Sequence, residues 1–284
     1  MDLTNKRIVV TGSDGFLGHH LMPLLRKSNV TVIKHEDYEL ISLAQVKLIY
    51  RNYYPDIVIH LAARVGGIQY NQANPAKLFY ENIQMGINLI HCGMEYGKLE
   101  KLVCIGTTCS YGRIPPRIPF NEDDLWEGYP ESTNAPYGIA KKSLLVMCQS
   151  YRKQHEMNCI YLIPTNLFGQ WDNFNDTQAH VIPMLIKKFV NAKENNLPEC
   201  EVWGSGLATR EFLYAGDAAK AIILATEKYD KPEPLNIGCG QEISIVKLAE
   251  LISKLVGYEG KIKLNSSMPD GQPRRVLDIS RMKV

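Results

Sequence analysis

The sequence has no long apolar run, no run of basic residues longer than a pair and no CxxC pair of cysteines. A helix that crosses a membrane needs about 20 consecutive apolar residues, and no stretch of this chain approaches that length. The amino-terminal residues MDLTNKR lead directly into an apolar strand, without the apolar core of a signal peptide. We therefore expect a cytoplasmic protein that has no membrane partner.

The charges of the chain nearly cancel, because 32 Lys and Arg residues stand against 30 Asp and Glu residues. Basic residues never form a run longer than a pair. A nucleic-acid backbone attracts a concentrated basic surface, so nucleic acid is not an expected partner.

The seven cysteines are an odd number, contain no CxxC pair and lie mostly in apolar segments. This pattern is typical of reduced thiols in a cytosol and gives no reason to expect a metal site. Cys109 is the exception, because it lies in the polar cluster TTCS at the end of an apolar strand. The other six are expected to fill the core: Cys92, Cys104, Cys148, Cys159, Cys200 and Cys239.

Apolar runs alternate with helical patterns through the amino-terminal part of the chain. We expect strands at residues 7–11, 30–34, 56–62, 101–106 and 158–164, and helices at residues 16–27, 76–96 and 137–154. Several strands are apolar throughout, as strands buried on both faces must be, so the alternation predicts a parallel sheet of βαβ units. The expected fold class is α/β: a Rossmann-type doubly wound parallel sheet with a smaller, interleaved C-terminal α/β substrate domain.

The second half of the chain has a looser pattern. A polar loop, TNLFGQWDNFNDTQAH, precedes the helical segment VIPMLIKKFVNA, and another helical segment, SIVKLAELISKLVG, follows later. We expect an NADP-binding Rossmann domain over residues 1–165 and about 209–232. Residues 166–208 and 233–284 are expected to form the substrate domain, which caps the carboxyl ends of the strands.

The segment IVVTGSDGFLGHHL places Gly12, Gly15 and Gly18 between the first strand and the first helix. This order allows a tight turn, close approach of the backbone to a pyrophosphate, and phosphate binding at the helix amino terminus. The alternative is that the glycines serve only a sharp turn. The second strand ends in VIKHED, so Lys34 and His35 favour the 2′-phosphate of NADP(H), unless Lys34 is simply a solvated strand end.

Tyr137 and Lys141 are four residues apart at the start of a predicted helix. At this spacing both side chains lie on one helix face, where the ammonium can lower the phenol pKa and the phenol can serve as acid or base. Roughly one such spacing is expected by chance, but this pair follows the fourth strand of a dinucleotide-binding pattern. Thr107, at the end of that strand, can donate to the same substrate oxygen.

The combination of TGSDGFLG, Thr107 at the fourth strand end and YGIAK resembles the extended short-chain dehydrogenase/reductase superfamily. Within it, the segments HLAARVGGI, IGTTCSYG, IPTNLFGQWDNF, HVIPMLIKKF, VWGSG with REFLY, and PDGQPRR are similar to GDP-sugar epimerase-reductases. The likeness runs over nearly the whole chain. It implies epimerisation at C3 and C5 of GDP-4-keto-6-deoxy-D-mannose and NADPH-dependent reduction at C4, giving GDP-L-fucose.

The resemblance also implies roles for individual residues. Thr107, Tyr137 and Lys141 would form the reductase triad, and Cys109 and His180 the epimerase base and acid. Asn166, Lys188, Trp203, Arg210 and Arg275 match positions expected to bind the GDP-sugar, with Lys188 in place of the commoner Arg. The cofactor would contact Gly12, Ser13, Asp14, Gly15, Phe16, Leu17, Gly18, Lys34, Ala62, Ala63, Tyr137, Lys141, Pro164, Asn166, Leu167 and His180.

Other interpretations stay open on the sequence alone. Cys109 could be a small buried residue beside a turn, and His180 could cap the helix that begins at Val181. The chain could act on another 4-keto sugar, such as a heptose or a dideoxy sugar, or could be a non-catalytic NADP-binding sensor. A homodimer formed by the apolar helices around residues 76–96 and 137–154 is expected by analogy with the superfamily.

Overall fold

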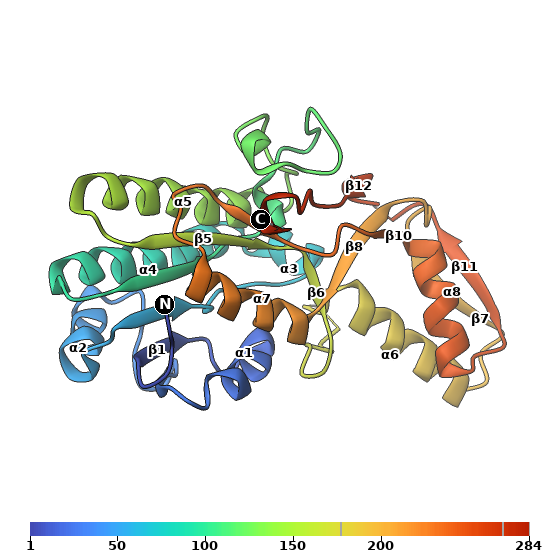
Figure 1. Ribbon diagram of the computed structural model, residues 1–284. Coiled ribbons are helices and arrows are strands. Elements are labelled where there is room, and N and C mark those ends of the chain that lie inside the picture. The colour runs from blue at the N-terminus through green and yellow to red at the C-terminus, as the bar shows by residue number, and fades with distance from the viewer. Residues whose placement is uncertain (177, 269, 284) are drawn as a thin grey trace.

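A six-stranded parallel sheet forms the larger part of the computed structural model (Figure 1), which describes residues 1–176, 178–268 and 270–283. The strand order is β2-β1-β3-β4-β5-β9, so successive strands are added on opposite sides of β1, and the switch point lies between β1 and β3. Open α/β sheets bind ligands at the carboxyl ends of their strands, at such a switch point. The strands are β1 (Arg7–Thr11), β2 (Asn29–Ile33), β3 (Ile57–His60), β4 (Lys101–Ile105), β5 (Cys159–Pro164) and β9 (Leu235–Ile237).

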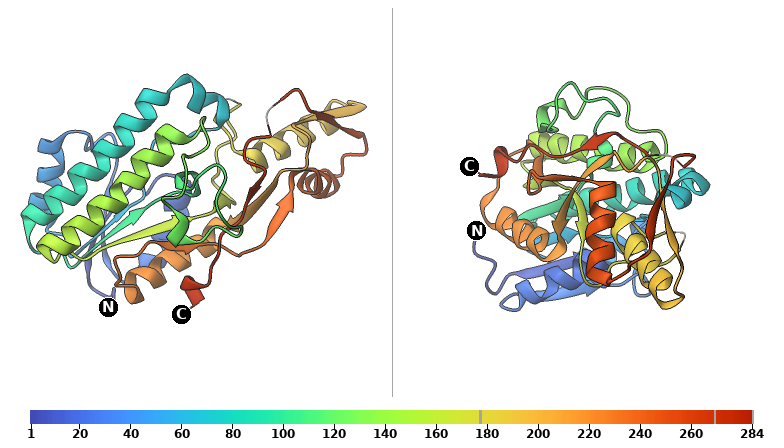
Figure 2. Two further views of the ribbon diagram at one scale, coloured as in Figure 1. Left: turned by 90° about the horizontal axis from the view of Figure 1, so that it is seen from above. Right: turned by 90° about the vertical axis from the view of Figure 1, so that its right-hand side faces the viewer.

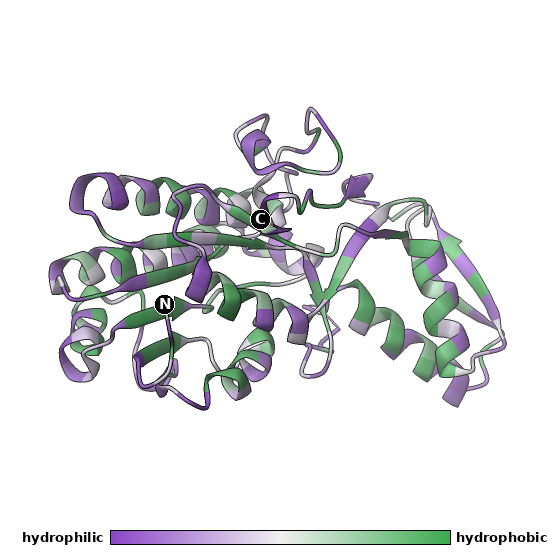
Figure 3. Cartoon of the chain, in the orientation of Figure 1, coloured by the Kyte–Doolittle hydropathy of each residue, from purple (hydrophilic) through white to green (hydrophobic). Residues whose placement is uncertain are grey.

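Helices cover both faces of this sheet, so its central strands are apolar and buried (Figure 3). One face packs in a single apolar core against α2 (Leu43–Tyr53), α4 (Pro75–Tyr96) and α5 (Ala135–His155). The other face packs against α1 (Phe16–Leu21), the short 3₁₀ helix η1 (Met22–Leu25) and α7 (Ala215–Lys228). Helices α4 and α5 lie side by side (Figure 2), and α3 (Ile68–Ala73) precedes α4.

The doubly wound parallel sheet predicted from the sequence is confirmed, with one helix shorter than expected. The predicted helix over 16–27 ends at Leu21 and continues only as the 3₁₀ turn η1. Pro23 explains the change, because proline lacks an N–H group and its ring clashes with the carbonyl one turn earlier. The other predicted strands and helices begin and end within about two residues of the observed ones.

The smaller part of the molecule lies beyond the carboxyl ends of the large sheet (Figure 1). Two helices, α6 (Val181–Glu194) and α8 (Ile245–Val256), share its apolar core with the strand β7 (Glu199–Trp203). A mixed four-stranded sheet and a two-stranded sheet complete it. The strands are β6 (Asn166–Phe168), β8 (Thr209–Tyr214), β10 (Glu242–Ser244) and β12 (Arg274–Arg275), with β7 paired to β11 (Lys261–Asn265).

Two strands differ from the division predicted from the sequence. Strand β9 falls in the range assigned to the substrate domain, yet it pairs with β5 and completes the large sheet, because its apolar residues are buried. Strand β8 falls in the range assigned to the Rossmann domain, yet it pairs with β6, β10 and β12 in the smaller sheet. None of the helices in the described ranges combines the length and apolar character needed to cross a membrane.

Candidate active site

A cavity of about 1090 Å³ opens at the carboxyl ends of the large sheet and reaches α6 and β7 of the smaller part. The site residues predicted from the sequence come together there, since all of them line the cavity except Ser13. Ser13 is buried instead, and its hydroxyl has no hydrogen-bond partner among the described residues. Residues far apart in the sequence therefore form one site between the two parts of the molecule.

The glycine-rich loop after β1 leaves no room for a side chain at Gly12 or Gly18. Gly12 has a φ angle of +71°, and a Cβ atom there would lie 2.7 Å from the amide nitrogen of Ala62. A Cβ atom on Gly18 would lie 2.3 Å from the carbonyl oxygen of Ser13. The loop thus brings bare backbone to the cavity at the point where α1 begins, as a bound dinucleotide requires.

The predicted 2′-phosphate locus also reaches the cavity. Lys34 and His35 both line it and are largely exposed. The Lys34 ammonium lies 3.4 Å from Glu36, and the His35 ring lies 3.4 Å from Glu39. Exposed ion pairs of this kind are weak, so the Lys34 charge is available to an anionic ligand.

The polar cluster at the end of β4 forms a 3₁₀ turn, η2 (Thr108–Ser110). The Thr107 hydroxyl accepts a hydrogen bond from the Cys109 amide at 3.2 Å, and the Ser110 hydroxyl donates to the Gly138 carbonyl at 3.0 Å. A Cβ atom on Gly138 would lie 2.2 Å from the Cys109 carbonyl oxygen. The cluster satisfies its own backbone and also holds Cys109 against the first turn of α5, which carries Tyr137.

Tyr137 and Lys141 face the cavity from the first two turns of α5. Burial raises the pKa of the Tyr137 phenol, while interaction with the Thr107 side chain lowers it in part. Burial also lowers the pKa of Lys141, which is only 1% exposed and forms no hydrogen bond or ion pair through its ammonium to any described residue. The pair offers a protonated phenol and an unpartnered cation to a ligand.

His180 begins α6 from the N-cap position, with extended backbone angles, and its ring faces the cavity. His180 is an exposed residue, yet the neighbouring protein atoms partly desolvate its ring and lower its pKa, and the Asp172 carboxylate opposes this shift. Asp172 Oδ2 is buried and has no hydrogen-bond partner among the described residues, and burial raises the Asp172 pKa. Sequence reasoning missed Asp172, although it lies within the quoted segment IPTNLFGQWDNF.

Two arginines of the smaller part lie beside the Cys109 turn. Arg275 Nη1 donates a hydrogen bond to Cys109 Sγ at 3.6 Å, and Arg275 Nε donates to Gln272 Oε1 at 3.1 Å. Arg210 donates to the carbonyl oxygens of Thr209 and Asp270 at 2.7 and 3.0 Å. Burial, followed by the charge of Arg275, lowers the pKa of Arg210 to about 10.

The other predicted substrate contacts are already engaged with the protein. The Lys188 ammonium lies 4.9 Å from the centre of the Trp203 ring and donates to the Glu201 carbonyl at 3.0 Å. The Asn166 side-chain amide donates to the Glu211 carbonyl at 2.9 Å. Lys188 therefore presents its charge from a fixed position on the face of Trp203, which also lines the cavity.

A chain of three polar side chains also lines the cavity and was not predicted. Asn71 donates to Asn134 Oδ1 at 2.9 Å, and Asn134 donates to Glu131 Oε2 at 3.0 Å. Asn71 and Asn134 are 63 residues apart in the sequence, so only the tertiary fold reveals the contact. These two hydrogen bonds, among Asn71, Asn134 and Glu131, fix the loop that leads into α5.

Known proteins resemble this chain over nearly its full length. The model of the NAD dependent epimerase/dehydratase family matches residues 8–238. A protein of Oryza sativa subsp. japonica named "Probable GDP-L-fucose synthase 1" is 38% identical over 281 residues, covering 98% of this chain and 85% of the rice protein.

Solved structures share the fold closely. A GDP-6-OMe-4-keto-L-xylo-heptose reductase from C. jejuni has a TM-score of 0.91 at 26% identity, covering 100% of this chain and 92% of that chain. A GDP-L-fucose synthetase from Naegleria fowleri bound to NADP has a TM-score of 0.88 at 28% identity, covering 98% of this chain and 87% of that chain.

Proposed function

Because the chain belongs to the NAD dependent epimerase/dehydratase family, we propose that it converts GDP-4-keto-6-deoxy-D-mannose to GDP-L-fucose. The reaction combines epimerisation at C3 and C5 with NADPH-dependent reduction at C4. The observation that carries the proposal is that Cys109, His180 and Tyr137 line one cavity together with Lys141. These side chains supply the proton acceptor and the two proton donors that the combined chemistry requires.

The cofactor is NADP(H), and the residues present fit it. The bare backbone from Gly12 to Gly18 would hold the pyrophosphate, and Lys34 would face the 2′-phosphate. The unpartnered ammonium of Lys141 would hold the nicotinamide ribose. When bound, NADPH supplies the hydride that reduces a C4 ketone.

The epimerase step follows from the acidity that a C4 ketone gives to the hydrogens on C3 and C5. The Cys109 thiolate takes one of these protons, and the electron pair of the broken C–H bond moves to O4, where Tyr137 and Thr107 can donate hydrogen bonds. His180 returns a proton to the same carbon from the other face, which inverts the centre. The two groups come from different parts of the molecule, since Cys109 follows β4 and His180 begins α6.

The reductase step uses the burial of Tyr137. Its raised pKa keeps the phenol protonated at neutral pH, so it can deliver a proton to O4 as C4 is reduced. Lys141, four residues further along α5, would stabilise the phenolate that remains.

The GDP-sugar would be held by residues of the smaller part. Arg210 and Arg275 supply two guanidinium groups for the diphosphate, and Lys188 with Trp203 presents a charge and a ring near α6. Asn166 would contact the ligand beside its own bond to the Glu211 carbonyl.

The likeness to the C. jejuni heptose reductase supports a second candidate, reduction of another GDP-4-keto sugar. A non-catalytic sensor is less favoured, because such a protein has no need of Tyr137 and Lys141. We also infer a cytoplasmic location, in keeping with seven unpaired cysteines, and a homodimer through α4 and α5, which carry the exposed side chains Phe79, Tyr80 and Val146.

Incubation of the purified chain with NADPH and GDP-4-keto-6-deoxy-D-mannose tests the proposed function. Oxidation of NADPH, followed by absorbance, should accompany formation of GDP-L-fucose, identified by NMR. A GDP-4-keto heptose and a GDP-4-keto-3,6-dideoxy sugar serve as rival substrates. If only one of the rival sugars were converted, that sugar would be assigned as the substrate. If the protein bound NADPH but oxidised it with none of the three sugars, the non-catalytic sensor would be supported.

A further inference from the structure

We propose that Arg275 holds the thiolate of Cys109 and that Gln272 positions Arg275 for this task. As a step in epimerisation the idea rests on the proposed function, but the contact itself can be tested without any sugar. The sequence resemblance implies only a GDP-sugar contact for Arg275.

The geometry directs one edge of the guanidinium at the sulfur. Arg275 is 8% exposed, and its Nη1 lies 3.6 Å from Cys109 Sγ. Its Nε donates to Gln272 Oε1, and Gln272 Nε2 donates in turn to the carbonyls of Gly112 and Arg113 at 3.2 and 2.9 Å. Because both carbonyls can only accept, the Gln272 amide has one orientation, with its oxygen toward Arg275. The backbone that follows Cys109, at Gly112 and Arg113, therefore holds Gln272. Gln272 in turn orients Arg275 toward the Cys109 sulfur.

The charges around the sulfur favour an anion. Neither Arg275 nor Arg210 forms an ion pair with a carboxylate within the described ranges. The pKa of Arg210 responds to both Arg275 and Cys109, so the two guanidinium groups share one neighbourhood with the thiol. Arginine stays protonated at any relevant pH, so Arg275 offers a permanent charge to the sulfur.

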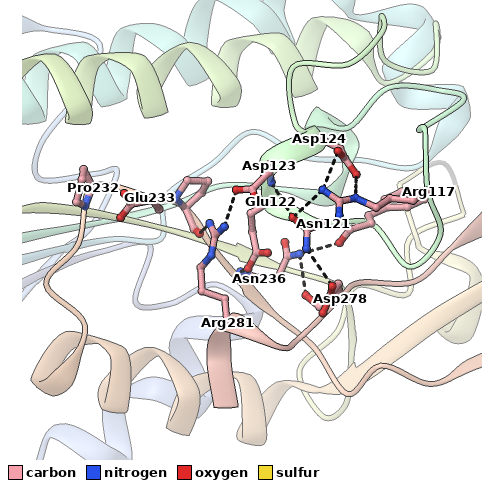
Figure 4. A network of polar contacts seen from close by, with 12 residues as sticks. Arg117, Asn121, Glu122, Asp123, Asp124, Pro232, Glu233, Asn236, Asp278 and Arg281 are labelled. Atoms are coloured by element: carbon pink, nitrogen blue, oxygen red, sulfur yellow. Dashed lines mark hydrogen bonds and ion pairs between the residues drawn. The ribbon is translucent and has the colours of Figure 1, made fainter. Parts of the chain in front are cut away.

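The segment that follows Arg275 is fixed by hydrogen bonds and an ion pair, and Figure 4 shows those around Asp278 and Arg281. The Leu277 amide donates to the buried Glu211 carboxylate at 2.7 Å. Asp278 accepts from Asn121 and Asn236, each at 3.0 Å, and Arg281 pairs with Asp123. Arg275 is thus held in place by neighbouring structure before any ligand arrives.

This arrangement gives Arg275 a defined part in proton removal. The thiolate takes the proton from the ring carbon and becomes a thiol, the C–H electron pair moves to O4, and Arg275 keeps all its protons. Its Nη2 forms no hydrogen bond to a described residue, so the same guanidinium can also contact the ligand. Arg275 would then connect the GDP-sugar with the base that acts on it.

Alkylation of the substrate-free protein with iodoacetamide at pH 7 tests the contact, because only the thiolate reacts. Mass spectrometry of the Cys109 peptide should show alkylation about tenfold slower in Arg275→Met than in the wild type. Arg274→Met is the matched control, since Arg274 neighbours Arg275 but pairs with Glu242. It should leave the rate at Cys109 unchanged. Within each sample the exposed Cys239 serves as the reference for reagent activity, and continued protection of the buried Cys104 and Cys148 reports intact folding.

Two further variants keep the test decisive if Arg275→Met does not fold. Arg275→Lys should restore part of the rate through its charge, and Gln272→Ala should slow alkylation because the guanidinium loses its anchor. The proposal would be overturned if folded Arg275 and Gln272 variants were alkylated at Cys109 at the wild-type rate. A raised KM for the GDP-sugar in those variants would then show that Arg275 is only a substrate contact. Slower alkylation in a chain that converts no GDP-keto sugar would uphold the contact and reject the proposed function instead.

Discussion

The carbonyl oxygen of Cys109 occupies the space that a side chain on Gly138 would need, 2.2 Å from the position of its Cβ atom. The close approach joins the end of β4 to the first turn of α5. Cys109 and Tyr137 are therefore placed by the same contact.

Replacing Gly138 by Ala should push these two elements apart and impair epimerisation and reduction together. We expect kcat to fall by at least about 100-fold, because sub-ångström displacement of reacting groups is costly. Ser143→Ala is the control on the same helix, since the Ser143 hydroxyl donates to the Ile139 carbonyl within that helix and to no other residue that the structure describes. Full activity in Gly138→Ala would show that the contact does not set the geometry of the site.

Replacing Tyr137 by Phe should abolish reduction, because no proton donor remains for O4. The loss should be about 10²-fold to 10⁴-fold in kcat, as for other general acids. NADPH binding, measured by fluorescence, should persist through the glycine loop. Tyr151→Phe, on the same helix, should behave like the wild type. NADPH oxidation at the wild-type rate in the Tyr137 variant would refute the reductase assignment.

Lys34 should give a preference for NADPH over NADH, because a cation at the 2′-phosphate forms a charge-assisted bond that contributes about 1.5 to 3 kcal/mol. Lys34→Ala should reduce kcat/KM for NADPH about tenfold or more and leave kcat/KM for NADH nearly unchanged. If the wild-type protein used both cofactors with equal efficiency, another residue would determine the preference.

His60 should make stability depend on pH. Burial lowers its pKa well below 6.5, and its Nδ1 lies 2.8 Å from the Thr11 hydroxyl. Below the ordinary pKa of histidine, His60 takes up a proton in the unfolded chain but not in the folded chain. The stability that neutral His60 contributes to the folded state is therefore fully present above pH 6.5 and is lost as the pH falls. Between pH 6 and 5.5 the free energy of unfolding in urea should fall by up to about 1.4 kcal/mol per pH unit from this group.

The variant His60→Gln should reduce that slope, because glutamine does not titrate. His155→Gln, at an exposed position at the end of α5, should reduce it much less. Equal slopes in the wild type and His60→Gln would mean that other groups account for the pH dependence.

Local sequence signals predicted the elements and most of the residues that the structure places around the cavity, whereas contacts between distant segments could not be predicted from the sequence. The glycine loop and the pair Tyr137 and Lys141 depend on short spacings that a sequence displays directly. Gln272 bonds to Gly112 from 160 positions away, and β9 joins β5 across a long insertion, so only the tertiary fold brings these segments together. Pro23 is the instructive exception, since its effect on the first helix was visible in the sequence.

The most direct test of whether Cys109 is the epimerase base is deuterium exchange into the keto sugar. The protein is incubated with the sugar in heavy water, and NADPH is omitted. The wild-type protein should introduce deuterium at C3 and C5, as followed by NMR, because proton removal at these carbons needs no hydride. Cys109→Ser should suppress the exchange, since an alcohol is far less ionised than a thiol near neutral pH. It should still bind NADPH and reduce the unepimerised ketone slowly. Exchange at the wild-type rate in Cys109→Ser would instead mean that Cys109 is only a packed thiol at the end of β4.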